Sequence, residues 1–215
     1  MRIVLTAFLL AAAAAPARAA KAGEALLWQE RHYWDGLLQA RDRAARQSAD
    51  PALLEVVLAL AHQAAQQAAN IEQIQAYVRA QLDNLKFAFS QEDPGASLGV
   101  IQNNFTTLAQ GAEQIRNNLY YLTARARMAG TQALPDPKLS ENATLFIAQI
   151  QNIQLKLNAL YADASAAHAG VQGETWAVDD FFRFSSQSLL SAVISVQDSV
   201  FAVYNASYEL YTLSK

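Results

Sequence analysis

Apolar residues recur at steps of three and four along most of this chain, and this spacing predicts helices. One run comprises Leu98, Ile101, Phe105, Leu108, Ala112, Ile115, Leu119 and Leu122. Another comprises Ala143, Phe146, Ile150, Ile153, Leu157 and Leu160. An average step of about 3.5 residues keeps apolar side chains on one helix face, and it is typical of helices that pack lengthwise with a left-handed twist.

Glycine and proline are sparse, and they divide the chain into long segments. They gather at 50–51, 90–99, 130–137 and 170–173. The stretches between these clusters are rich in Ala, Leu and Gln, which favour helices over strands. We therefore predict helices over residues 24–48, 51–90, 97–129, 138–168 and 174–213.

The predicted fold class is all-α, namely an elongated up-and-down bundle of four to five long helices with coiled-coil-like packing. Whether 24–48 and 51–90 form one kinked rod or two antiparallel helices is left open by the sequence. Helix starts carry suitable capping residues: Asp50 and Asp136, each followed by proline, and Ser97 for the third helix.

The last predicted helix carries two apolar stripes side by side. The first comprises Phe182, Leu189, Val193, Val196, Val200, Val203 and Leu210. The second, called the outer stripe below, comprises Leu190, Ile194, Phe201, Tyr204, Tyr208 and Tyr211. Burial of both stripes in a central helix is the simpler interpretation, because together they are wider than a surface helix needs. The alternative is that Phe201, Tyr204, Tyr208 and Tyr211 form a partner surface.

The N-terminus has the pattern of a secretory signal peptide. Met1-Arg2 gives a positive start, an apolar run follows, and Ala17 and Ala19 supply small residues at the cleavage site. The apolar run is shorter than the roughly 20 residues that span a bilayer. We expect cleavage of residues 1–19, a single helical-bundle domain over 20–215, and a periplasmic or secreted protein of a Gram-negative bacterium.

Composition excludes several classes of function. The formal net charge is −3, and loss of Arg2 and Arg18 with the leader makes it more negative, which argues against nucleic acid as a partner. The chain has no cysteine, which removes disulfides, thiolate metal sites and lipid anchors. We expect no transmembrane segment after cleavage, because Gln197, Asp198 and Asn205 interrupt the most apolar stretch. Without a basic polar face, contact with a membrane surface is not expected either.

The residues that could carry chemistry are few and scattered. The chain has 3 histidines, His32, His62 and His168, and no Glu-x-x-His pair of the di-iron kind occurs. Haem ligation by Met128 and His168 would fail if their helices are antiparallel neighbours, since the two residues would then lie at opposite ends. We therefore predict no catalytic residue, no metal site and no cofactor, and hence no enzyme.

The most specific hint of binding lies near the start of the predicted mature chain. Trp34 shares an apolar stripe with Leu37 and Leu38, whereas Trp28 and Tyr33 fall off it. An exposed aromatic residue at such a place can belong to a docking surface or a small pocket. Trp28 and Tyr33 therefore join the predicted partner surface.

The sequence favours a non-enzymatic envelope protein that acts through protein–protein contacts, by self-association or as a subunit of a larger assembly. The alternative is a periplasmic bundle that holds a small ligand, metal or haem between helices. That alternative predicts a concave pocket lined by some of Trp28, His32, Trp34, Tyr204 and Tyr208.

Overall fold

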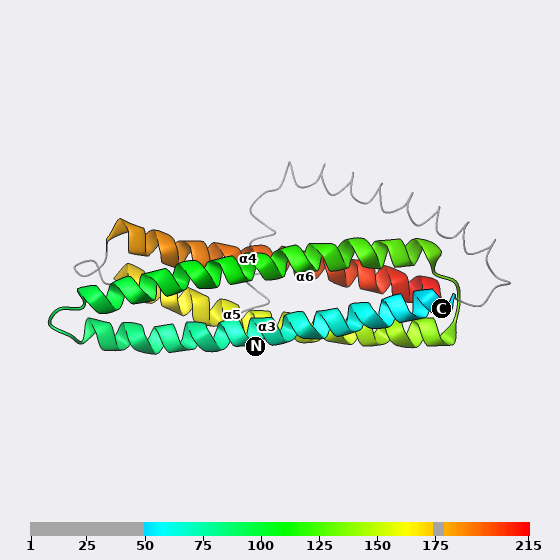
Figure 1. The fold of residues 1–215 in the computed structure, drawn as a ribbon, viewed down its shortest axis with the longest axis horizontal. Coiled ribbons are helices and arrows are strands. Elements are labelled where there is room, and N and C mark those ends of the chain that lie inside the picture. Colours follow the sequence, from blue (N-terminus) through cyan, green and yellow to red (C-terminus); the bar gives the residue numbers. More distant parts are fainter. Residues whose placement is uncertain (1–49, 174–178) are drawn as a thin grey trace, which may run out of the picture. The chain divides into compact units, whose positions relative to one another are not determined.

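The computed structural model describes residues 50–173 and 179–215, which lie in the unit Gln47–Lys215. These residues form four helices and no strand: α3 (Pro51–Phe89), α4 (Gly95–Gln132), α5 (Pro137–Gly173) and α6 (Asp180–Ser214). The four helices pack against one another (Figure 1), so the predicted all-α class is confirmed for the described residues. The helix predicted over 24–48, and how it would join the next one, lie outside them.

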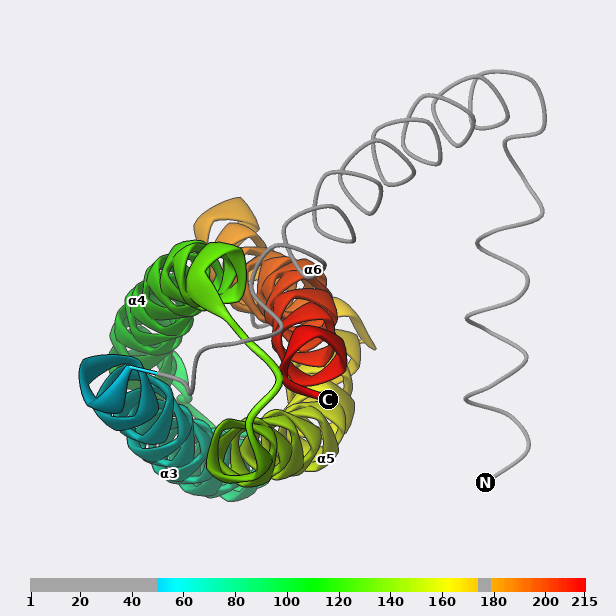
Figure 2. The ribbon, with the colours of Figure 1, turned by 90° about the vertical axis from the view of Figure 1, so that its right-hand side faces the viewer.

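Each helix packs against two others. The neighbouring pairs are α3 with α4, α3 with α5, α4 with α6, and α5 with α6. Successive helices run in opposite directions (Figure 1), while the loop over 133–136 crosses the end of the four-helix group diagonally (Figure 2). As a result α3 and α5 are parallel neighbours, and so are α4 and α6.

The predicted apolar positions are buried almost as expected. In α5, residues Leu139, Ala143, Phe146, Ile150, Ile153, Leu157 and Leu160 are each no more than 1% exposed. In α6 the first stripe is buried throughout, and the ring of Phe182 stacks on that of Phe105 in α4 with 5.9 Å between centroids. Burial of these side chains is the main favourable contribution to folding.

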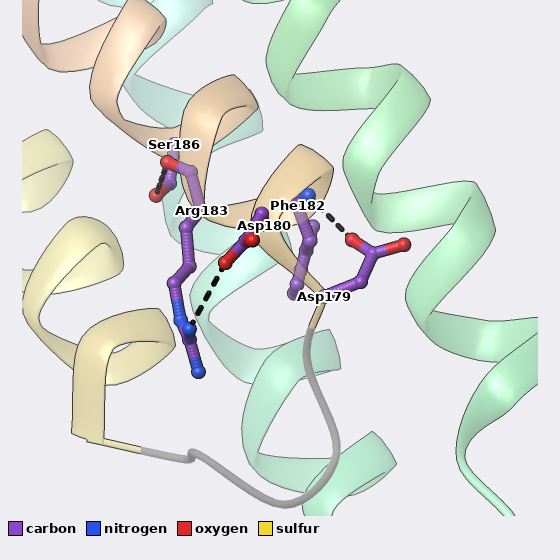
Figure 3. A network of polar contacts seen from close by, with 5 residues as sticks. All are labelled: Asp179, Asp180, Phe182, Arg183 and Ser186. Atoms are coloured by element: carbon purple, nitrogen blue, oxygen red, sulfur yellow. Dashed lines mark hydrogen bonds and ion pairs between the residues drawn. The ribbon is translucent and has the colours of Figure 1, made fainter.

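At three helix starts, a side-chain oxygen accepts a hydrogen bond from a free backbone N–H group, as predicted for Asp50 and Asp136. Asp50 Oδ1 accepts a hydrogen bond from the backbone N–H of Ala52 at 2.9 Å. Asp136 Oδ1 accepts one from Leu139 at 3.1 Å. At the start of α6, Asp179 Oδ1 accepts from the backbone N–H of Phe182 at 2.7 Å (Figure 3). These bonds replace helical partners that the first turn lacks.

Two predictions about helix ends were wrong. The cap of α4 is Pro94, without a side-chain hydrogen bond, and Ser97 lies inside the helix. The helix therefore begins two residues earlier than predicted, at Gly95. The helix predicted over 138–168 continues through Gly170 and ends at Gly173, the last residue of the cluster over 170–173. A glycine inside a helix costs about 1 kcal/mol relative to alanine, which long helices with buried faces tolerate.

One edge of α5 carries polar contacts to α3. Asp163 accepts hydrogen bonds from Arg79 at 2.8 Å and from Gln75 at 3.0 Å. Seven residues earlier, Lys156 forms an ion pair with Glu72. Since Arg79 and Glu72 are mostly exposed, these pairs contribute at most about 1 kcal/mol each. They link α3 to α5 at two places along their length.

Candidate functional site

The outer stripe of α6 is partly exposed and partly buried. Ile194, Phe201 and Tyr208 are 42%, 66% and 52% exposed. They follow one another at seven-residue steps, so they lie in a row on one face of the helix. This half of the stripe points away from the core of the four described helices.

The other half of the outer stripe leans on the core. Leu190 and Tyr204 are partly buried and pack against the main apolar cluster. Tyr211 packs against a smaller cluster near the end of α6, and the Lys215 Nζ lies 4.3 Å from its ring centroid. The rings of Tyr208 and Tyr211 are 6.2 Å apart between centroids. The predicted stripe is therefore neither a wholly buried flank nor a wholly free surface.

Two further exposed aromatic residues lie at the start of α6 and were not predicted. Phe181 and Phe184 are 62% and 64% exposed. They line a shallow hollow of about 160 Å³ with residues of α4, among them Gln110 and Glu113. The sequence places Phe182 on the core stripe, and at about 100° per residue Phe181 and Phe184 lie roughly 100° and 160° away from it around the helix, off that stripe.

A buried serine contacts a histidine between α5 and α6. The distance from His168 Nδ1 to Ser186 Oγ is 3.0 Å. The Ser186 hydroxyl also lies 2.8 Å from the carbonyl of Arg183, to which it donates (Figure 3). Ser186 is only 1% exposed and lies within a helix whose N–H groups are already bonded. A nucleophile needs an accessible oxygen and nearby oxyanion donors, and this pair has neither. We assign it a structural role.

The remaining candidate ligands do not come together. Met128 is 65% exposed near the end of α4, and α4 lies diagonally across from the α5 helix that carries His168. His62 is exposed on α3. Within residues 50–173 and 179–215, no group of three or more His, Asp and Glu side chains is placed to hold a metal. Trp28, Tyr33, His32 and Trp34 lie outside the described residues.

An amide network between α3 and α4 was missed by the sequence analysis. Gln67 is 7% exposed, and its Oε1 accepts hydrogen bonds from Asn70 at 3.4 Å and from Asn118 at 3.1 Å. Fourteen residues further along α3 the arrangement repeats. There Gln81, also 7% exposed, accepts from Asn84 at 3.4 Å and from Asn104 at 3.0 Å.

Comparison with protein-family models, with curated proteins and with solved structures finds no match. The function of the chain is therefore argued from its own residues.

Among the described helices, α6 alone is long and apolar enough to cross a membrane, with a mean hydropathy of 1.3 over its most apolar window. The core helix of a protein in water passes the same test, and 44% of that window is buried within the structure. Asp198 lies exposed in the middle of this helix. The absence of a membrane span in the mature protein stays a prediction.

The described surface offers two arrangements that can bind another molecule. One is the row of exposed aromatic and aliphatic side chains on α6, which suits an apolar partner. The other is the pair of amide-lined hollows between α3 and α4, which suits a neutral hydrogen-bonding one.

Proposed function

We propose that this chain is an exported, non-enzymatic helical-bundle protein of the bacterial envelope that acts through protein–protein contacts as a structural or assembly subunit. The observation that carries this proposal is the exposure of Ile194, Phe201 and Tyr208 in a row along α6. Large aromatic side chains that remain in water on a folded domain favour association, and such residues are enriched at protein interfaces.

The geometry of the row favours a helical partner. Partly buried Leu190 and Tyr204 lie beside the exposed residues, so the apolar face is broader than a single line. The outer stripe advances by alternating steps of three and four, with Gln197 as its polar member. A partner helix with the same spacing can lay its apolar face along such a stripe.

The finer features of the fold belong to the same proposal. Coiled-coil-like packing among the helices is supported by the buried residues of α5, which alternate steps of three and four without interruption. A fifth helix over 24–48 and a single domain over 20–215 complete it. Trp28 and Tyr33 would extend the partner surface from that segment.

Export is proposed from the leader-like sequence of residues 1–19, and it implies the periplasm or the exterior of a Gram-negative cell. N-terminal sequencing of the protein recovered from its native host should give Ala20 as the first residue. Recovery of the intact N-terminus from the cytosol would contradict export and leave the α6 surface untouched as a hypothesis.

The role of the surface is tested with two matched double variants of the mature chain. Phe201→Ser with Tyr208→Ser removes the exposed row, whereas Phe87→Ser with Tyr120→Ser changes an equally exposed phenylalanine and tyrosine on α3 and α4. Light scattering and pull-down from an envelope extract should show a complex for the wild type and the control pair. The α6 pair should lose it.

Self-association and a foreign partner are separated by the same experiment. A complex in the purified protein alone indicates self-association, and one that forms only in the extract indicates a different subunit. A wild-type monomer that recovers no partner, or equal losses in both double variants, would overturn the proposal.

A further inference from the structure

The hollow beside Gln67 has an unusual lining for the surface of a helix pair. It measures about 320 Å³ and is lined mainly by carboxamides and one phenol. The lining residues used below are Gln63, Gln66, Gln67, Asn70, Asn118 and Tyr121. None of the lining residues is charged, although Glu72 on α3 and Arg116 and Arg125 on α4 follow or precede them by a few residues. We call this hollow the amide groove.

Hydrogen bonds hold the floor of the amide groove in place. Gln67 Oε1 accepts from one asparagine of its own helix and from Asn118 of the facing helix. Gln63 Oε1 is buried and has no hydrogen-bond partner among the described residues. A buried acceptor without a donor is rare in folded proteins and calls for a specific explanation.

An aromatic ring stands at the side of the groove. Tyr121 is 58% exposed, and the guanidinium carbon of Arg125 lies 5.6 Å from its ring centroid. This contact with a cation steadies the ring. A steadied, exposed ring offers an apolar face to a ligand, while the carboxamides offer both donors and acceptors.

We propose that the amide groove binds a neutral carbohydrate, with the sugar hydroxyls bonded to the carboxamides and the C–H face of the ring against Tyr121. A hydroxyl both donates and accepts, as does a carboxamide, so neighbouring hydroxyls match a cluster of amides without any charge. The lining itself offers no countercharge to an ionic ligand, and the Arg125 guanidinium beside it already contacts the Tyr121 ring. A protein partner would leave hydrogen-bonding amides facing apolar side chains, at a cost for each unpaired group.

A second hollow extends the proposal to a chain of sugars. Gln81 and Asn104 lie in a hollow of about 330 Å³ that also includes Tyr77, which is 54% exposed. Fourteen residues of helix separate the two glutamines, or about 21 Å. Between them Gly111 faces Ile74 so closely that an added Cβ would lie 3.1 Å from the isoleucine Cδ1. Two similar hollows on the same pair of helices fit an oligosaccharide better than a single sugar.

The proposal is tested by calorimetric titration of the mature protein with maltohexaose, cellohexaose and hexa-N-acetylchitohexaose, together with side-chain amide NMR spectra. We expect at least one of these to bind and to shift the Gln63, Gln67 and Asn118 amide signals. Tyr121→Ala should weaken binding roughly tenfold, which equals about 1.4 kcal/mol. Tyr120→Ala is the matched control, since Tyr120 is 53% exposed one residue away and lines neither hollow.

Gln63→Leu provides a second variant that retains the fold and removes the buried acceptor. It should weaken the same sugar while leaving the circular-dichroism spectrum unchanged. Absence of binding by all three oligosaccharides would overturn the proposal. Equal weakening in the Tyr120 and Tyr121 variants would also overturn it, as would amide shifts that follow protein concentration instead of sugar. Shifts that follow protein concentration would indicate that the amide groove binds a second copy of the chain.

Discussion

Two leucines of α5, two residues apart, provide a sharp test of the packing. Leu157 is fully buried between α5 and its neighbours, whereas Leu155 is 70% exposed. Leu157→Ala should lower the free energy of unfolding by about 3 kcal/mol, because the lost burial adds to the cost of the cavity. Leu155→Ala should change it by less than about 0.5 kcal/mol, since that side chain remains in water.

The comparison is made by urea unfolding of the mature chain, followed by circular dichroism at 222 nm. At this chain length each kcal/mol corresponds to roughly 2–4 °C, so Leu157→Ala should also lower the melting temperature by about 6–12 °C. The slope of free energy against urea should stay constant, because the same surface is exposed on unfolding. Losses of similar size in the two variants would refute the assignment of the buried face of α5.

Four further substitutions probe other features of the described helices. Gly99→Ala should raise the free energy of unfolding by about 0.8 kcal/mol, because an added Cβ meets nothing within 4 Å. Gly111→Ala should raise the free energy of unfolding by less, since the added Cβ must displace the end of the Ile74 side chain. A larger increase than in Gly99→Ala, measured by urea unfolding, would contradict this. Gln63→Leu should raise the free energy of unfolding by about 1 kcal/mol, by removing an unpaired buried acceptor, and a loss measured by calorimetry would show that the acceptor has a partner. Asp179→Ala should lower it by about 1 kcal/mol through loss of the cap, and an unchanged melting temperature would contradict the bond drawn in Figure 3.

Much of the helical content follows from spacing alone. The predicted helix 51–90 is observed as Pro51–Phe89, since aspartate and proline start it and a largely apolar buried face runs along it. The helix predicted over 97–129 is longer at both ends, because the glycines near its start cost less than the packing of Leu98 and Ile101 gains. Local residue preferences are weak compared with burial, so helix ends are the least predictable feature.

The order of neighbours could not be predicted. Short loops indicate that successive helices run in opposite directions, but the four-residue connection over 133–136 reaches a diagonal helix as well as an adjacent one. What holds it is a hydrogen bond from the backbone N–H of Asp136 to the carbonyl of Ser214, far apart in the sequence. Such a contact leaves no trace in local spacing.

The candidate binding surfaces, too, could be predicted from the sequence only in part. The outer stripe was visible as a repeat, but its exposure depends on where α4 and α5 lie against α6. The amide network was detectable only as glutamines and asparagines at fourteen-residue intervals on two helices. The network forms because α3 and α4 lie in antiparallel register, which places Gln67 beside Asn118 and Gln81 beside Asn104.

In the proposed function, the exposed row on α6 meets a protein partner. It is tested most directly by placing a photo-activated cross-linking amino acid at position 201, and separately at position 87, in the protein expressed in its native host. Phe201 and Phe87 are 66% and 64% exposed, so general accessibility is matched. We expect a discrete adduct from position 201 and none from position 87. Equal labelling at both positions, or no adduct from position 201, would contradict it.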